Sequence, residues 1–199
     1  MLQVLSTNYN DRNPQAALYE NAVRFLPTEK DQLPLEKPTI ILGAYGKDWD
    51  FYALKGRVEV LLDRLGVSSC EYRPYTESPN YHPGRCAQIL CGDRIIGILG
   101  EIHPQVCQNF EIEARVYVAQ LDTDQLFALH KDERHYTPLP KFPASTRDLA
   151  LLCSEEVPVA CLEKVIRQNG GKLLEQVDLF DIYRGAQIPQ DQKSVAYSL

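Results

Sequence analysis

Apolar residues recur at helical spacing between positions 54 and 65. Offsets of four, seven, eight and eleven residues bring them onto one face of an α-helix. A glycine follows at position 66, and glycine is typical of the residue just beyond a helix C-terminus. The pattern therefore predicts one amphipathic helix that packs by this face. The apolar positions are Leu54, Val58, Leu61, Leu62 and Leu65.

Short apolar or alternating runs on both sides of this helix predict β-strands. The Gly92-Asp93 pair predicts a tight turn that joins two of them as an antiparallel hairpin. A short helix is expected over residues 124–129, whereas the opening stretch is polar and predicts no helix. The fold class is therefore α+β, an antiparallel sheet with helices. The predicted strands cover residues 17–25, 39–44, 71–75, 87–91, 94–99 and 115–121.

Three prolines lie close together between residues 130 and 146, at Pro138, Pro140 and Pro143. Proline has no amide donor and disfavours the helical conformation of the residue before it, so this stretch predicts a connector. We expect a first domain over residues 1–135, a Pro-rich connector over 136–146 and a second domain over 147–199.

The second domain has a β-α-β-β order. A strand over 147–153 is followed by a helix over 158–168, which Gly170-Gly171 ends, and by strands over 174–183 and 194–199. These are the first four elements of the βαββαβ ferredoxin-like plan. The last helix and strand are missing, so an apolar strand edge near 147–152 is left unpaired. We expect this domain to be poorly ordered unless it self-associates, and to bind RNA weakly.

Composition limits the possible partners and the compartment. The formal net charge is -6 and the pI about 5.3, so no bulk positive field attracts nucleic acid. No signal peptide or membrane span is recognisable, which predicts a cytoplasmic protein without membrane contact. The six cysteines include no C-x-x-C pair, so free thiols are expected. They are Cys70, Cys86, Cys91, Cys107, Cys153 and Cys161.

Candidate chemistry is sparse. His103 and Cys107 are four apart, but the intervening stretch is not convincingly helical, so no metal site is expected. No phosphate-binding loop or serine elbow is present, and no catalytic residue is predicted. Arg85 follows a Pro-Gly turn and is a possible anion contact. The alternative is that Arg85 pairs with a nearby carboxylate.

Motifs in both halves resemble one family. The second half has Lys141-Phe-Pro-Ala-Ser-Thr-Arg-Asp-Leu-Ala-Leu, Asp178-Leu-Phe-Asp-Ile-Tyr-Arg-Gly and Lys193-Ser-Val-Ala-Tyr. The first half has Trp49-Asp-Phe-Tyr-Ala-Leu-Lys-Gly, His82-Pro-Gly-Arg-Cys-Ala and Gly97-Ile-Leu-Gly-Glu-Ile-His-Pro. These motifs resemble, in order, the C-terminal part of the bacterial phenylalanyl-tRNA synthetase β subunit.

The resemblance implies a class II synthetase-like, non-catalytic domain followed by a truncated ferredoxin-fold anticodon-binding domain. The whole enzyme of that family is an α2β2 heterotetramer that joins phenylalanine to tRNA(Phe) with ATP and Mg2+, and its α subunit holds the active site. The fragment is then expected to contribute assembly surface and anticodon-region contact. It would hold no cofactor and be inactive alone.

Candidate RNA contacts are aromatic and basic residues of the second domain and one lysine of the connector, since small RNA-binding sheets stack bases on aromatics and hold phosphates with cations. Alternation alone favours the aromatics as core residues, and Asp148 and Asp181 could occupy the arginines as ion pairs. The candidates are Arg147, Arg184, Tyr183, Lys141, Lys193 and Tyr197.

Two other function classes stay open. One is a free-standing RNA-binding or regulatory module that reuses the synthetase-like fold without a role in charging. The other is a thiol-dependent enzyme, for which only the cysteine count speaks. A longer reading frame around the chain would favour the β-subunit reading over the first of these.

Overall fold

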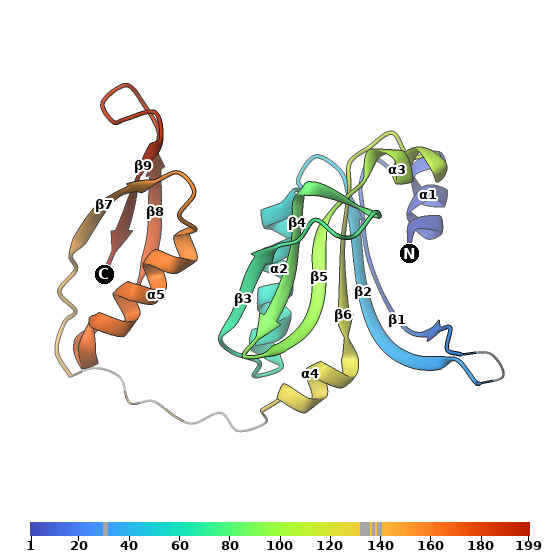
Figure 1. Cartoon of the computed structure of the whole chain (residues 1–199), viewed down its shortest axis with the longest axis horizontal. Helices are drawn as coiled ribbons and strands as arrows, with labels where there is room; N and C mark the ends of the chain where they lie inside the picture. The colour runs from blue at the N-terminus through green and yellow to red at the C-terminus, as the bar shows by residue number, and fades with distance from the viewer. Residues whose placement is uncertain (30–31, 132–135, 137, 139–140) are drawn as a thin grey trace. The chain divides into compact units, whose positions relative to one another are not determined.

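The chain forms two compact units in a computed structural model, Met1–His135 and Tyr136–Leu199. The structure describes residues 1–29, 32–131, 136, 138 and 141–199 (Figure 1). Part of the predicted connector, residues 137, 139 and 140, lies outside the described residues. Both units combine helices with antiparallel sheets, so the predicted α+β class is confirmed.

The first unit is built on a six-stranded sheet in the order β1-β2-β6-β5-β4-β3, in which every neighbouring pair is antiparallel. The Gly92 turn joins β4 to β5 as predicted, and its φ of 61° is one that glycine adopts without strain. The strands are β1 Ala16–Leu26, β2 Leu35–Tyr45, β3 Cys70–Pro74, β4 Tyr81–Cys91, β5 Arg94–Ile102 and β6 Val116–Asp122.

Helices cover both faces of this sheet. On one face, α2 (Phe51–Arg64) buries its predicted apolar stripe against β5 and β6. α4 (Thr123–Leu129) adds Leu126 to the same core. On the other face, α1 (Leu2–Asn10) packs on β1 and β2, and its Leu5 shares one core with Cys107 of α3 (Pro104–Asn109) and Val116 of β6. The helix predicted from the stripe is confirmed: the Asp50 side chain caps its N-terminus, and Gly66 follows its end with a φ of +67°.

Two helices were not predicted. The polar opening segment forms α1, because a single fully buried Leu5 and its neighbours are enough to anchor one helical face on the sheet. The segment after His103 is also helical, contrary to the prediction. The ring of His103 accepts a hydrogen bond from the Gln105 amide, and Pro104 opens the helix without losing a needed donor.

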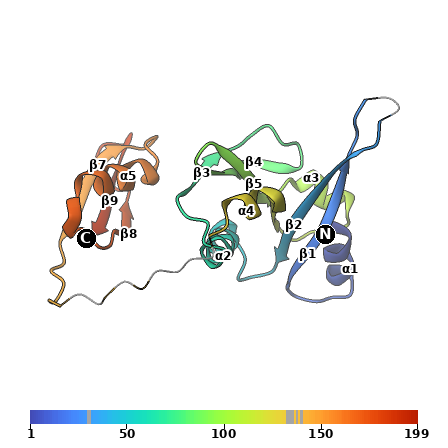
Figure 2. The same cartoon turned by 90° about the horizontal axis from the view of Figure 1, so that it is seen from below.

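The β1–β2 hairpin extends past its neighbours. β6 pairs with β2 only from Thr39 onward, whereas β1 pairs with β2 out to Leu26 and Leu35. Figure 2 shows this end of the hairpin projecting from the sheet. β1 is also the outer strand, so its free edge carries unpaired backbone groups.

The second unit has a three-stranded antiparallel sheet in the order β7-β9-β8. This order is the 1-3-2 arrangement of a ferredoxin-like plan. β8 begins later than predicted, at Asp178 and not at Leu174, and β9 begins earlier, at Gln192 and not at Ser194. Its elements are β7 Asp148–Ser154, α5 Val159–Asn169, the 3-10 turn Gly171–Leu173, β8 Asp178–Tyr183 and β9 Gln192–Ser198.

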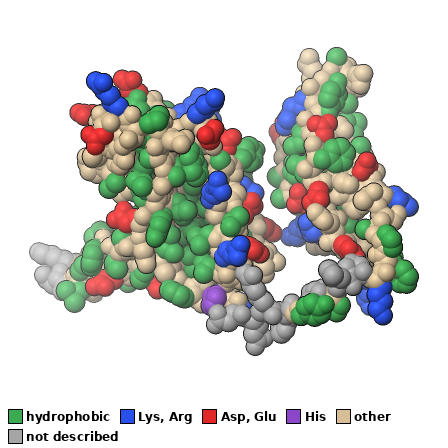
Figure 3. All heavy atoms as spheres, turned by 180° about the vertical axis from the view of Figure 1, so that it is seen from behind, with side chains coloured by type: hydrophobic (Ala, Val, Ile, Leu, Met, Phe, Trp, Pro, Cys, Tyr) green, Lys and Arg blue, Asp and Glu red, His purple; other side chains and the backbone are tan. Residues whose placement is uncertain are grey.

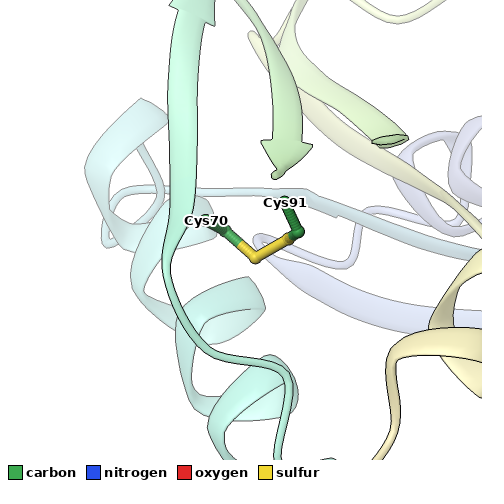
Figure 4. Close-up of a disulfide and its surroundings, with 2 residues drawn as sticks. All are labelled: Cys70 and Cys91. Atoms are coloured by element: carbon green, nitrogen blue, oxygen red, sulfur yellow. A yellow bond between two sulfur atoms is a disulfide. The ribbon is translucent and has the colours of Figure 1, made fainter. Parts of the chain in front are cut away.

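The prediction of six free thiols is wrong for one pair. Cys70 on β3 and Cys91 on β4 are cross-strand partners and form a disulfide, with their Cα atoms 4.2 Å apart (Figure 4). Sequence spacing could not reveal the pair, because it depends on the register between two strands whose cysteines lie 21 positions apart.

Candidate nucleic-acid interface

α5 covers one face of the β7-β9-β8 sheet. Its apolar side chains pack on a small core around Val195 and Tyr197. Cross-strand partners share a face of a sheet, so the partners of these two residues also point toward the helix. The opposite face carries the alternate positions, and no described helix packs on it (Figure 1).

One row of this open face is a candidate base platform. Ser194 of β9 pairs with Leu152 of β7 on one side and with Tyr183 of β8 on the other. Leu152 is 57% exposed and Tyr183 41% exposed, while the serine between them is small. The row therefore has one large side chain on each side of a small serine. A flat base can lie on such a surface.

The far end of the same face is acidic. Asp148 and Asp178 flank Ser198, and Asp181 lies one row nearer to Tyr183. All three carboxylates are exposed. Because carboxylates repel phosphate, this end of the face is unfavourable for a nucleic-acid backbone.

A β-bulge changes the predicted faces of β8. The register shifts between Leu179 and Asp181, so Phe180 is the extra residue. Leu179 then pairs with Tyr197 and points toward the helix, whereas strict alternation had put it on one face with Asp181 and Tyr183. Phe180 is 59% exposed.

Arg184 is held by an ion pair. Its Nε donates to both carboxylate oxygens of Glu155 at 3.0 Å, and one terminal nitrogen donates to Oε1 at 2.7 Å. This hydrogen bonding lowers the pKa of the Glu155 carboxyl, with smaller contributions from the charges of Arg184 and Lys193. An acidic partner was foreseen, but Asp181 was expected and the partner is Glu155 at the end of β7.

Lys193 and Tyr197 belong to the core side of the sheet. Lys193 is buried, and its ammonium donates to the Glu155 carbonyl oxygen at 2.8 Å. The Tyr197 ring has no exposed surface, its hydroxyl donates to the Val159 carbonyl oxygen, and burial raises its pKa to about 12. Neither side chain offers RNA a surface, so the prediction that they contact RNA is corrected to a packing role.

Arg147 and Lys141 are exposed near the start of β7. The Arg147 backbone pairs with Leu199, and its guanidinium donates to the Ser145 hydroxyl and the Thr146 carbonyl. Among the described residues, no carboxylate pairs with Arg147. The six candidates thus do not share one surface: Tyr183 lies on the open face, Arg184 and Lys193 meet at Glu155, and Tyr197 is inside.

Arg85 in the first unit is paired. One guanidinium nitrogen donates to both carboxylate oxygens of Glu101 at 2.9 Å, and Arg115 lies 3.9 Å away from the same group. The Glu101 side chain is only 4% exposed. Residues 82–85 are not paired with β5, because the register of the β4–β5 ladder shifts between Tyr81 and Cys86. This irregularity places the Arg85 side chain beside Glu101. Arg85 therefore fills the alternative role predicted for it, a partner of a carboxylate.

Two of the free thiols, Cys86 and Cys107, are buried. Burial raises the pKa of Cys86 to about 11 and raises that of Cys107. Thiolates are the reactive form, so both are unreactive near neutral pH. Within the described ranges, no three His, Cys, Asp or Glu residues gather to hold a metal ion.

Basic and acidic side chains are intermixed on the face that Figure 3 shows. None of the described helices is long and apolar enough to cross a bilayer.

Leu152 and Ser194 are the platform residues that the sequence did not reveal. Both lie in strands that were predicted, but only the pairing of both β7 and β8 with β9 puts them in one row with Tyr183. They could have been predicted to share a row only from the strand order β7-β9-β8, in which β9 lies between the other two strands.

Comparisons with known proteins agree with this architecture. Residues 1–123 match the family described as "Phenylalanyl tRNA synthetase beta chain CLM domain", and residues 140–199 match "Ferredoxin-fold anticodon binding domain". Relatives named phenylalanine–tRNA ligase β subunit align with the whole chain. They include proteins of Clostridium tetani (44% identical), Clostridium acetobutylicum (42%) and Bacillus subtilis (37%), of which the alignment covers 25%, 25% and 26%.

The two matches assign the six-stranded unit to a synthetase β-chain domain family and the second unit to the ferredoxin-fold anticodon-binding domain family. The chain belongs to the phenylalanyl-tRNA synthetase β-chain family. It spans about a quarter of the length of the curated relatives it matches.

Proposed function

We propose that this chain is a non-catalytic part of a cytoplasmic phenylalanine–tRNA ligase, in which it contributes a tRNA contact and a subunit-assembly surface. ATP and Mg2+ belong to the whole enzyme, whose reaction is carried out elsewhere. Residues 1–135 act as the synthetase-like scaffold, residues 136–146 as the connector and residues 147–199 as the anticodon-binding part. The observation that carries the proposal is the helix-free face of the β7-β9-β8 sheet, with Leu152 and Tyr183 exposed in one row.

The tRNA contact is a base contact. An exposed aromatic ring beside an aliphatic side chain accepts an unstacked base, which favours a single-stranded loop over a duplex. Arg147 and Lys141 are the candidate phosphate contacts, because both are exposed and have no carboxylate partner among the described residues. The acidic far end of the face repels phosphate and so limits the path of the RNA backbone across the sheet.

Titration of labelled tRNA(Phe) and a control tRNA at several salt concentrations tests this contact. Preferential binding of tRNA(Phe) is expected, with a shallow salt slope because few cations take part. Equal affinity for both tRNAs would reduce the contact to nonspecific charge. Leu152→Ser should weaken binding, whereas Val165→Ser, an exposed aliphatic change on α5, should not.

The α subunit is the proposed partner of strand β1. One face of this outer strand carries Tyr19, Val23 and Phe25, which are 80%, 43% and 62% exposed. An apolar face next to an unpaired strand edge is a surface that a partner covers. The assembled enzyme is expected to be an α2β2 heterotetramer.

Co-purification with the α subunit tests this surface. Tyr19→Glu should abolish or strongly weaken the complex by placing a charge in the contact. Val60→Glu is the matched control, since Val60 is a 58% exposed apolar residue on α2. If both variants co-purify like the parent, β1 is not the contact surface.

A further inference from the structure

A cleft of about 580 Å³ opens between the first turns of α2 and the start of β1. Pockets that hold small ligands have volumes of about 300–1,000 Å³. Gln15, Ala16 and Ala17 line one side, and α2 with the residues before it lines the other. The cleft lies wholly within the first unit, whereas the sheet face assigned to the anticodon region belongs to the second unit.

Aromatic and cationic side chains converge in this cleft. Trp49 and Tyr52 both line it, and Tyr52 is 76% exposed. The Arg57 guanidinium lies over the Trp49 ring, 5.9 Å from its centroid, and also lines the cleft. Among the described residues, Arg57 has no carboxylate partner. Aromatic side chains beside a guanidinium that no described carboxylate pairs are groups that bind a flat ring carrying a negative charge.

The floor of the cleft is open at Gly56. A Cβ added there would meet no heavy atom within 4 Å, and the helical backbone requires no glycine at this position. Glycine lowers the stability of a helix interior. At position 56 it leaves the cleft open where a side chain would fill it. Asp48 also lines the cleft and is a hydrogen-bond acceptor.

We propose that this cleft binds a nucleotide that carries an exocyclic amine. The base stacks against Trp49 and Tyr52, the phosphate meets Arg57, and Asp48 accepts a hydrogen bond from the amine. Such a nucleotide is either free or a unit of single-stranded RNA. In the second case the chain has an RNA contact in addition to the terminal sheet.

Trp49 is the one tryptophan of the chain, so its fluorescence reports directly on the cleft. The experiment titrates adenosine 5′-monophosphate, uridine 5′-monophosphate and ribose 5-phosphate, with excitation at the red edge of indole absorption. Saturable quenching by the adenine nucleotide is expected, with weaker binding of the uridine nucleotide and no quenching by the sugar phosphate. A short oligoadenylate that quenches at lower concentration identifies RNA as the source, and equal concentrations identify the free nucleotide.

Three variants separate binding from folding. Arg57→Gln should weaken nucleotide binding about tenfold, in line with the loss of a charged hydrogen bond. Arg64→Gln makes the same charge change at the exposed end of α2 and should leave binding unchanged. Gly56→Leu should block the cleft while it strengthens α2, so lost binding cannot be attributed to unfolding.

Absence of saturable quenching by either nucleotide overturns the proposal, as does equal nucleotide affinity of Arg57→Gln and the parent chain. Neither result bears on the terminal sheet, whose tRNA contact is measured separately.

Discussion

Arg184 holds both carboxylate oxygens of Glu155, at 3.0 Å from its Nε, and so joins the end of β8 to the end of β7. The strand between them contributes to the same corner, because Lys193 of β9 donates to the Glu155 carbonyl oxygen. A carboxylate with paired oxygens presents the same acceptors that a phosphate would. One of the basic residues that the sequence suggested for RNA contact is therefore already occupied.

Glu155→Gln should raise the affinity for RNA by at most about fivefold, since an exposed ion pair is weak and its loss removes one negative charge from beside Arg184. Salt-dependent RNA titration measures this, and the salt slope should steepen. Glu156→Gln is the control, because it changes the net charge equally at the next position. If both variants gain equally, the effect is one of net charge and not of Arg184. In an Arg184→Gln background, Glu155→Gln should have no more effect than the control.

The same pair predicts a pH dependence. Hydrogen bonding from Arg184 lowers the pKa of Glu155, so the folded chain favours the ionised form. A lowered pKa stabilises the fold above the ordinary value for glutamate, near 4.3, and this stability is lost as the pH falls through the lowered pKa. An NMR titration of the Glu155 carboxyl should show the shift. Arg184→Gln should return the pKa toward its ordinary value, and a pKa unaffected by that change would contradict the assignment.

The disulfide predicts a difference in stability between oxidised and reduced protein. Cys70 and Cys91 close a loop of 21 positions, for which the chain-entropy relation gives about 3 kcal/mol. Denaturant unfolding of Cys70→Ser with Cys91→Ser should show a loss of this order. Cys86→Ser is the control for reductant sensitivity: because Cys86 is not in the disulfide, reductant should still destabilise this variant. Equal stability of the parent with and without reductant would show that the bond contributes nothing.

Two arginines lie near the Glu101 carboxylate, and their contacts with it differ in distance. Arg85 donates to both of its oxygens at 2.9 Å, whereas Arg115 lies at 3.9 Å and is well exposed. Arg85→Gln should cost roughly 2–3 kcal/mol of unfolding free energy, because it leaves a buried carboxylate without its main partner. Arg115→Gln should cost less than about 1 kcal/mol. Denaturant unfolding compares the two, and equal costs would argue against a dominant Arg85 contact.

Much of the fold could be predicted from local periodicity and from the order of the elements along the chain. The stripe from Leu54 to Leu65 identified α2 because 3.6-residue spacing and a following glycine agree. The β-α-β-β order identified the second unit, since few arrangements connect such elements. Tertiary effects account for the misses. One anchoring residue, Leu5, turns a polar segment into α1, and the register of β3 against β4 creates the disulfide.

The candidate site was less predictable, because a strand's faces depend on pairing. Alternation separated Tyr183 from Arg184 correctly, but the bulge at Phe180 moved Leu179 to the helix side. Burial of Tyr197 follows from the position of α5, and Lys193 is drawn inward by the Glu155 carbonyl; a strand pattern contains neither. Leu152 has no polar or aromatic chemistry to mark it, so only its row with Ser194 and Tyr183 makes it a candidate.

Tyr197 and Tyr183 give the sharpest contrast between core and surface. Tyr197→Phe removes the hydrogen bond to the Val159 carbonyl and should cost about 1 kcal/mol of unfolding free energy, without change in RNA affinity. Tyr183→Ser removes an exposed ring and should weaken RNA binding at least about fivefold, with little loss of stability. Denaturant unfolding and tRNA titration are measured on both variants. Reduced RNA affinity of a folded Tyr197→Phe, with normal affinity of Tyr183→Ser, would place the RNA contact away from the open sheet face.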